Sequence, residues 1–201
     1  MAKSWDCLFE IEKYWDIVVA SEKLTSNYHK ELKEDLTYFN IEKFSPVADI
    51  GAGAFGGVLS YLDFGLPKYI IDPCATLFKN KYNQISNDII LIDSYSYNIP
   101  LVQDSLRTIF CIETLDHCNS IEEYKKSTEE MARVLCPGGT LYFMIPLREK
   151  KKTGHFICLE TISFEDIKMG FKHLEIIESI VKDKTEVEMN RHLYMTLRKP
   201  L

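Results

Sequence analysis

Four glycines stand close together in the stretch VADIGAGAFGG, directly after a short apolar run. Three of them, Gly51, Gly53 and Gly56, have the GxGxxG spacing of loops in which the backbone comes close to a ligand. Glycine has no Cβ, so the main chain can approach a bound molecule, and the free N–H groups of a following helix face it. The same spacing also suits tight packing between a helix and a strand, and both interpretations are open at this point.

Acidic residues close three consecutive apolar runs, at Asp49, Asp72 and Asp93. Asp72 stands 19 residues after Gly53, where a carboxylate can accept hydrogen bonds from both hydroxyls of a ribose. Asp93 should point into the same crevice, at the carboxyl edge of the sheet. Each acid alone is also compatible with a helix N-cap or a turn. Three in succession favour an adenosine-containing cofactor.

Apolar runs separated by helical segments predict the elements that position these residues. Strands are expected at PVADI, KYIID, DIILID, RTIFCIE and GTLYFMIP, with helices near Phe55–Phe64 and over Ser120–Val134 and a helix or turn after Pro73. Continuous apolar strands that alternate with helices indicate an α/β fold whose parallel sheet is covered on both faces. Further on, SFEDIKMGF predicts a helix with Ser163 as N-cap. LEIIESIVKD and RHLYMTLRKP then predict an antiparallel pair of strands.

The first part of the chain has a different character. Apolar residues recur at helical spacing from Trp5 to Ala20, and a second helix is expected over Leu24–Phe39. We therefore divide the chain into a helical extension, residues 1–45, and a core, residues 46–201. The extension either covers the pocket as a lid or is a structural amphipathic pair of helices.

Length and composition bound the classes of protein that remain. The 201 residues suffice for one domain with a sizeable core, and the net charge of −6 argues against nucleic acid as a partner. The start, MAKSWDCLFE, lacks a secretory signal, and the longest apolar stretch, Leu141–Leu147, is too short to span a membrane. The six cysteines form no CxxC pair, so we expect reduced thiols, a cytoplasmic protein and no metal site.

Five stretches, taken in order, resemble the motifs of one enzyme family. They are VADIGAGAFGG, YIIDPC, LIDSYSYNIP, FCIETLDHCNS and MARVLCPGGTLYFMIP. The chain is similar in these to the class I S-adenosylmethionine (SAM)-dependent methyltransferases, especially the small-molecule group with a methyltransferase-11-like domain. The resemblance implies a Rossmann-like seven-stranded sheet in the order 3-2-1-4-5-7-6, with strand 7 antiparallel. NAD also fits the glycines and acids, but the proline-glycine-glycine turn and the reversed tail speak against an NAD(P)-linked oxidoreductase.

The resemblance also implies a set of cofactor-binding residues, namely Asp49, Gly51, Gly53, Asp72, Asp93, Ser94 and Glu113. The first two glycines would admit the methionine part and the sugar of SAM, and Asp72 would hold the ribose hydroxyls. Asp93, with Ser94 beside it, would face the adenine amino group. Glu113, at the end of the fourth strand, would border the amino-acid end of the cofactor.

Methyl transfer needs the nucleophile in line with an activated methyl group, and a hydroxyl nucleophile also needs a proton acceptor. His117 and His155 follow the fourth and fifth strands, so they are the candidate bases. The stretch REKKK, residues 148–152, either meets an anionic group of the substrate or is a solvated loop. We expect methylation at oxygen or nitrogen of a small molecule such as a sugar, a lipid precursor or a secondary metabolite. The alternative is a non-catalytic, SAM-binding scaffold.

Overall fold

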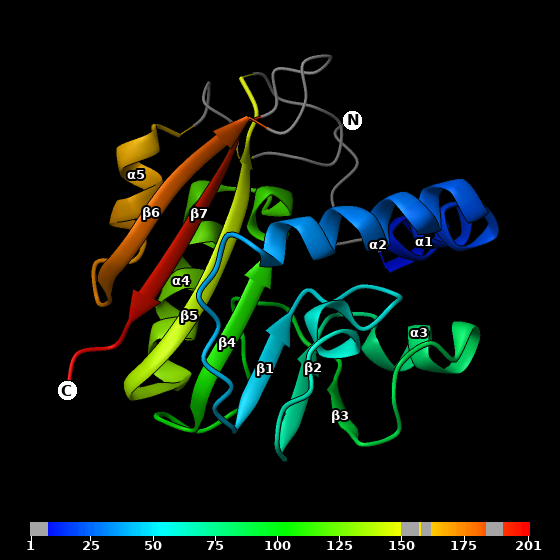
Figure 1. Cartoon of the computed structure of the whole chain (residues 1–201), viewed down its shortest axis with the longest axis horizontal. Helices are drawn as coiled ribbons and strands as arrows, with labels where there is room; N and C mark the ends of the chain where they lie inside the picture. Colours follow the sequence, from blue (N-terminus) through cyan, green and yellow to red (C-terminus); the bar gives the residue numbers. More distant parts are fainter. Residues whose placement is uncertain (1–7, 150–156, 158–161, 184–190) are drawn as a thin grey trace.

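A seven-stranded sheet runs through the molecule (Figure 1). The structure, a computed structural model, describes residues 8–149, 157, 162–183 and 191–201. The strands are β1 (Val47–Ile50), β2 (Lys68–Ile71), β3 (Ile89–Ile92), β4 (Leu106–Ile112), β5 (Leu135–Leu147), β6 (Glu175–Asp183) and β7 (Arg191–Arg198). Their order is β3-β2-β1-β4-β5-β7-β6, and β7 runs antiparallel to both neighbours. The predicted order and the predicted reversal at the tail are confirmed.

The first five strands are parallel, so their carboxyl ends meet at one edge of the sheet. The register aligns Asp49 with Ile70 on one side and with Phe110 on the other. On the far side of β5, the antiparallel β7 places His192 opposite Pro146. A residue near the start of β7 therefore lies at the same edge as residues near the ends of β4 and β5.

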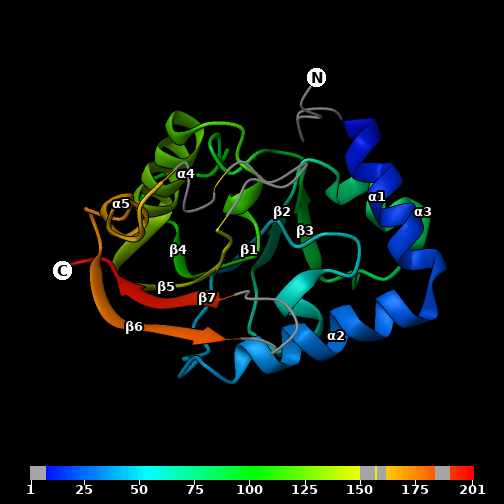
Figure 2. The same cartoon turned by 90° about the horizontal axis from the view of Figure 1, so that it is seen from above.

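Helices cover both faces of the sheet (Figure 2). They are α1 (Leu8–Ala20), α2 (Glu22–Leu36), α3 (Ala75–Tyr82), α4 (Ile121–Val134) and α5 (Phe164–Met169). Serine side chains cap α2, α4 and α5 by accepting a backbone N–H from the first turn, and the predicted N-cap at Ser163 is confirmed as part of a capping box. No helix among the described residues is long and apolar enough to cross a membrane.

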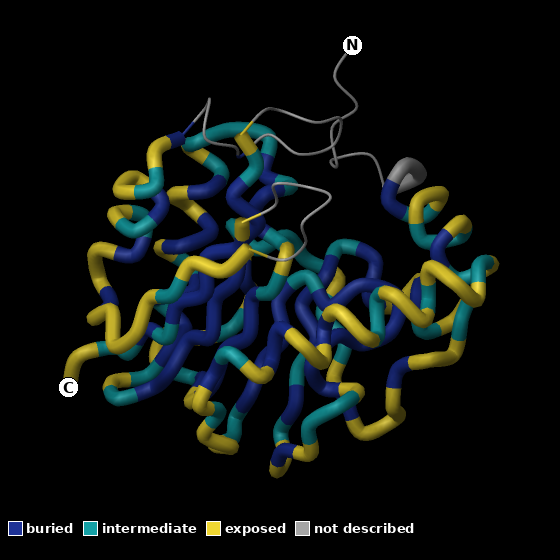
Figure 3. Tube along the Cα trace, turned by 45° about the horizontal axis from the view of Figure 1, so that its top comes forward, coloured by how far each residue is buried: buried dark blue, intermediate teal, exposed yellow. Residues whose placement is uncertain are grey.

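Two apolar cores lie on the two faces of the sheet. One packs α4 and α5 against β4 and β5 around Tyr124, Phe143 and Phe171, and the other packs α2 and α3 around Leu36 and Phe78. The central strands β1, β4, β5 and β7 are mostly buried, whereas the edge strand β6 is exposed (Figure 3). The carboxyl edge of the sheet, held between the two cores, carries the loops of the candidate site.

One predicted helix, Phe55–Phe64, is wrong. The chain forms only a short 3-10 helix, η1 (Gly57–Ser60), after the glycine loop. Gly56 and Gly57 both have positive φ, at 76° and 51°, which breaks the helical path. The Asp49 carboxylate accepts the backbone N–H of Val58 at 2.6 Å and so ends the loop from inside the core.

Candidate functional site

A cavity opens at the carboxyl edge of the sheet, between the strand ends and helices α1 and α2. Most of the residues selected from the sequence line it, namely Asp49, Gly51, Gly53, Asp72, Ser94, Glu113 and His117. Asp93 is not part of the lining, and His155 lies outside the described residues. The fold therefore brings seven separately chosen positions into one hollow.

The glycine loop is packed against side chains from two other elements. Gly51 and Gly53 have φ of 74° and 63°, a region that L side chains rarely adopt. A Cβ on Gly51 would lie 2.3 Å from Cγ2 of Thr114, and one on Gly53 would lie 2.3 Å from Cζ2 of Trp15. The packing interpretation of these glycines therefore holds, and the cavity that they line leaves the ligand interpretation open as well.

Asp72 is the best-anchored carboxylate of the cavity. Its Oδ2 accepts the backbone N–H of Gly53 at 3.1 Å, and its Oδ1 accepts that of Cys74 at 2.8 Å. Burial raises the pKa of Asp72, while these two hydrogen bonds favour the ionised form and lower it. A carboxylate has about four lone-pair positions, so both oxygens keep acceptor capacity for the hydroxyls of a ribose. Asp72 and the glycine loop that it contacts therefore fit SAM, the cofactor that the sequence predicts.

Asp49 lies deeper than Asp72 and is almost completely buried. Burial raises its pKa to about 7, although the hydrogen bond from the backbone N–H of Val58 lowers the pKa in part. A Cβ on Gly57 would meet its Oδ2 at 2.3 Å, so the loop closes tightly over this side chain. The carboxyl group shapes the glycine loop from below.

Asp93 and Ser94 follow β3, but their side chains serve local structure. The exposed Asp93 accepts the backbone N–H of Thr76, in the first turn of α3, at 2.8 Å. Ser94 donates to the carbonyl of Asn98 at 2.5 Å. Asp93 thus caps α3, as the alternative interpretation of a strand-end acid allowed, and its role toward adenine stays a prediction.

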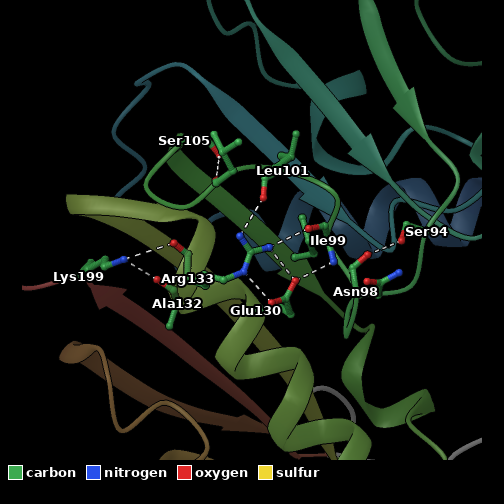
Figure 4. A network of polar contacts seen from close by, with 10 residues as sticks. Ser94, Asn98, Ile99, Leu101, Ser105, Glu130, Ala132, Arg133 and Lys199 are labelled. Atoms are coloured by element: carbon green, nitrogen blue, oxygen red, sulfur yellow. Dashed lines mark hydrogen bonds and ion pairs between the residues drawn. The ribbon is translucent and has the colours of Figure 1, made fainter.

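A polar network that the sequence did not reveal holds the loop after β3 (Figure 4). Arg133, from the motif MARVLCPGG, donates to the carbonyls of Ile99 and Leu101, both at 2.8 Å. Glu130 pairs with Arg133 at 2.7 Å and accepts the N–H of Ile99 at 2.9 Å. The end of α4 therefore fixes the loop that carries Ser94 to the cavity.

Glu113 stands at the cavity in an unusual conformation, with a positive φ of 51°. Its side chain is 41% exposed, and its Oε1 lies 4.0 Å from Nε2 of the buried His192. Sequence reasoning passed over His192, because only the antiparallel pairing of β7 brings it to this edge. The pair joins a rim carboxylate to a buried imidazole.

His117 ends η2 (Leu115–His117), which begins three residues after the end of β4, and lines the cavity. The adjacent Asp116 is buried and forms an ion pair with Arg148. Arg148 therefore neutralises a protein carboxylate, which accounts for the first residue of the REKKK stretch. Lys150, Lys151 and Lys152 lie outside the described residues.

Helices α1 and α2 cover the cavity with aromatic side chains. The ring of Trp15 makes edge contacts with Tyr28, Phe55 and Phe78, at centroid distances of 5.6–5.9 Å. Asp16 of α1 pairs with Lys81 of α3 at 2.7 Å and accepts a hydrogen bond from Tyr82 at 2.8 Å. The amino-terminal helices are thus attached to the core by both packing and charge.

Cysteine thiols and groups of metal-binding side chains are the other places where chemistry could occur. Cys74, Cys111 and Cys118 are free and buried, and burial raises the pKa of each thiol. Among the described residues there is no group of three or more His, Cys, Asp or Glu side chains that could hold a metal ion. The cavity, with its acids and its glycine loop, is the part of the described chain equipped for chemistry.

A sheet in this order, with a glycine loop and a buried acid at the ends of β1 and β2, defines a Rossmann-like methyltransferase fold. Residues 48–143 match the family model of a methyltransferase domain, methyltransferase-11. The chain therefore contains a methyltransferase domain over residues 48–143, and the methyl donor of such a domain is SAM. No curated protein matches the sequence.

Solved structures agree on the fold at low sequence identity. A SAM-dependent methyltransferase from Leishmania major has a TM-score of 0.69 at 13% identity, with 94% of this chain and 82% of that chain covered. The N-methyltransferase NodS from Bradyrhizobium japonicum, bound to S-adenosylhomocysteine, has a TM-score of 0.64 at 16% identity and covers 88% and 87%. The [4+2]-cyclase SpnF has a TM-score of 0.67 at 13% identity and covers 86% and 80%. Because proteins of this fold differ in the reactions that their names state, the reaction of this chain depends on the residues of its cavity and not on its fold.

Proposed function

We propose that this protein transfers the methyl group of SAM to an oxygen or nitrogen atom of a small molecule, such as a sugar, a lipid precursor or a secondary metabolite. One observation carries the proposal. The glycine loop and the buried Asp72 of the methyltransferase domain line a single cavity together with aromatic side chains of α1 and α2. Such a cavity holds a cofactor and an acceptor together and keeps water away from the reacting atoms.

The residues of the cavity divide into cofactor and acceptor groups. Asp72, Glu113 and the loop of Gly51 and Gly53 lie together in the cavity lining. We assign Asp72 to the ribose hydroxyls of SAM and the glycine loop to its sugar and methionine part. Glu113 is assigned to the amino-acid end. The adenine side is assigned to Asp93 and Ser94. Bound SAM supplies a methyl group on a sulfonium, whose sulfur keeps the electron pair of the broken bond. The protein aligns the nucleophile, and His117 or His155 takes its proton.

The remaining parts of the proposal concern the lid and the setting. We assign residues 1–45 to a lid, because Tyr14, Trp15 and Tyr28 line the cavity from α1 and α2. The net charge of −6 supports a small acceptor instead of nucleic acid. The buried free cysteines support a reducing, cytoplasmic setting.

Calorimetry with SAM and with NAD tests the cofactor, and release of S-adenosylhomocysteine in the presence of candidate acceptors tests the reaction. We expect SAM to bind and NAD not to bind. Binding of SAM without turnover on any of a broad panel of acceptors would favour the scaffold alternative. Tight binding of NAD would overturn the proposal.

A further inference from the structure

The cavity has acidic and aromatic walls. Six carboxylate side chains line it, from Glu31, Asp35, Asp49, Asp72, Glu113 and Glu123. Four aromatic rings line it as well, from Tyr14, Trp15, Tyr28 and Tyr95. Within the described lining there is no lysine or arginine. Such walls attract a cation by charge and by the faces of the rings, and they repel phosphate and carboxylate groups.

Four of the six carboxylates accept hydrogen bonds that hold the fold. The bonds come from Tyr194 to Asp35 at 2.6 Å, from Val58 to Asp49 at 2.6 Å, from Gly53 and Cys74 to Asp72, and from Asn119 to Glu123 at 2.7 Å. Glu31 and Glu113 are exposed residues of the cavity lining. Glu31 belongs to the lid helix α2, whereas Glu113 follows β4 at the sheet edge.

Tyr14, on α1, lies within electrostatic reach of both exposed carboxylates. Burial raises the pKa of its phenol, and Glu113, Asp116 and Glu31 raise it further, while Arg148 lowers it. The rim of the cavity around Tyr14 is therefore negative. The cofactor, which carries a sulfonium and an ammonium group against one carboxylate, takes up part of this charge near the glycine loop. Glu31, on α2, also lines the cavity and is not among the residues assigned to the cofactor.

We propose that the acceptor is a cationic amine, whose ammonium group enters the cavity beside Glu31 and against the ring of Tyr14. This inference rests on the proposed function and narrows it from oxygen or nitrogen to nitrogen. The ammonium first loses a proton to a basic side chain of the site. The lone pair of the nitrogen then forms the N–C bond to the methyl group as the S–C bond breaks, and its electron pair remains on sulfur.

The test uses three small probes that share a phenyl ring but differ in the charge of the head group. They are 2-phenylethylamine, 2-phenylethanol and phenylacetate, titrated by calorimetry into the whole protein saturated with S-adenosylhomocysteine. We expect the amine to bind about ten- to a hundredfold more tightly than the alcohol, as a charge-assisted contact predicts, and phenylacetate to bind weakest. Equal or tighter binding of the alcohol or of phenylacetate, or no binding of the amine, overturns the inference.

Two variants of α2 locate the effect. Glu31→Gln should reduce the ratio between amine and alcohol affinities to about threefold or less. Glu34→Gln removes the same charge from an exposed position of the same helix that does not line the cavity, so this ratio should remain. An equal fall in both variants would show a general charge effect and would contradict the role of Glu31.

The proposed function has a separate readout. Binding of SAM and release of S-adenosylhomocysteine are measured on the same protein with all three probes. A protein that binds SAM and methylates the alcohol as readily as the amine overturns the present inference and leaves the proposed function standing. A folded protein that does not bind SAM overturns both.

Discussion

The indole ring of Trp15 lies against the backbone of Gly53, so closely that a Cβ on the glycine would come 2.3 Å from Cζ2 of the ring. Helix α1 and the glycine loop therefore share one contact surface. Gly53 is required both by its positive φ of 63° and by the ring above it. A side chain added at Gly53 would therefore collide with α1.

Gly53→Ala should lower the free energy of unfolding by roughly 2–5 kcal/mol. About 1–2 kcal/mol arises from an L side chain at positive φ, and about 1–3 kcal/mol from overpacking against Trp15. Gly138→Ala is a matched control, because Gly138 has a φ of 72° but its Cβ would meet only the terminal Leu201, at 3.3 Å. We expect the control to lose about 1–2 kcal/mol in urea unfolding.

A double-mutant cycle separates the two contributions. In a Trp15→Ala background, Gly53→Ala should cost no more than the control, since the ring that it meets is gone. An equal cost of Gly53→Ala with and without Trp15 would show that the contact between these residues does not matter.

Asp72→Ala should weaken SAM binding about ten- to a hundredfold, because it removes the charged acceptor assigned to the ribose, worth roughly 1.5–3 kcal/mol. It also removes the partner of the Gly53 and Cys74 N–H groups, so some loss of stability accompanies it. Asp72→Asn keeps one acceptor oxygen and should fall between Ala and wild type. Asp63→Ala changes an exposed acid outside the cavity and serves as the control. Unchanged SAM affinity in folded Asp72→Ala contradicts the assignment.

The buried Asp49 predicts a pH dependence of stability. Its pKa is about 7 in the folded chain and 3.8 when unfolded, so between these values the folded state holds a proton that the unfolded state has released. Stability therefore falls as the pH rises through this window and is constant above it, with a loss of roughly 2–3 kcal/mol between pH 5 and 8. The pKa of Asp72 is shifted in the same direction and adds to the effect.

Asp49→Asn should remove the part of this pH dependence that belongs to Asp49, because an amide does not titrate and can still accept the Val58 N–H. Urea unfolding at pH 5 and pH 8 measures the loss in wild type and in the variant. Asp63→Asn, at an exposed position, should behave as wild type. A pH dependence that Asp49→Asn leaves intact would place its origin elsewhere.

The sheet could be predicted from the sequence because its strands are short, apolar and regularly spaced. The order of the strands came from the resemblance of the motifs and not from the apolar pattern itself. The helix predicted after the glycine loop is wrong. The segment GVLSYLDF is apolar enough for an α-helix but does not form one. Its conformation depends on Gly56 and Gly57 at positive φ and on the Asp49 carboxylate beneath it, which are tertiary features.

The sequence predicts those site residues that follow a strand of the parallel sheet. It does not predict those that reach the site through strand pairing across the sheet. Gly51 and Asp72 stand directly after β1 and β2, and His117 follows the end of β4 by five residues. His192 lies 79 residues after Glu113 in the sequence and reaches it only through the antiparallel β7. Arg133 belonged to a recognised motif, but its contacts with the loop after β3 required the structure.

His117 provides the last prediction, which concerns the proton of the acceptor. It lines the cavity from η2 and is the histidine that the described lining contains. A bound ammonium must lose a proton before its nitrogen has a lone pair for the methyl group, and a hydroxyl must lose its proton as its oxygen bonds to the methyl group. His117→Ala should therefore slow single-turnover methyl transfer by about 10²–10⁴, while SAM affinity stays within about threefold.

The control is His173→Ala, at an exposed position outside the cavity, which should transfer the methyl group at the wild-type rate. His155→Ala is measured in parallel, since this residue follows β5 and is the alternative base. A large loss in His155→Ala alone would move the role to that residue. If both variants keep near-native rates across pH, neither histidine takes the proton. The enzyme would then act by alignment alone, on an acceptor that binds already deprotonated or that releases its proton to a carboxylate such as Glu113.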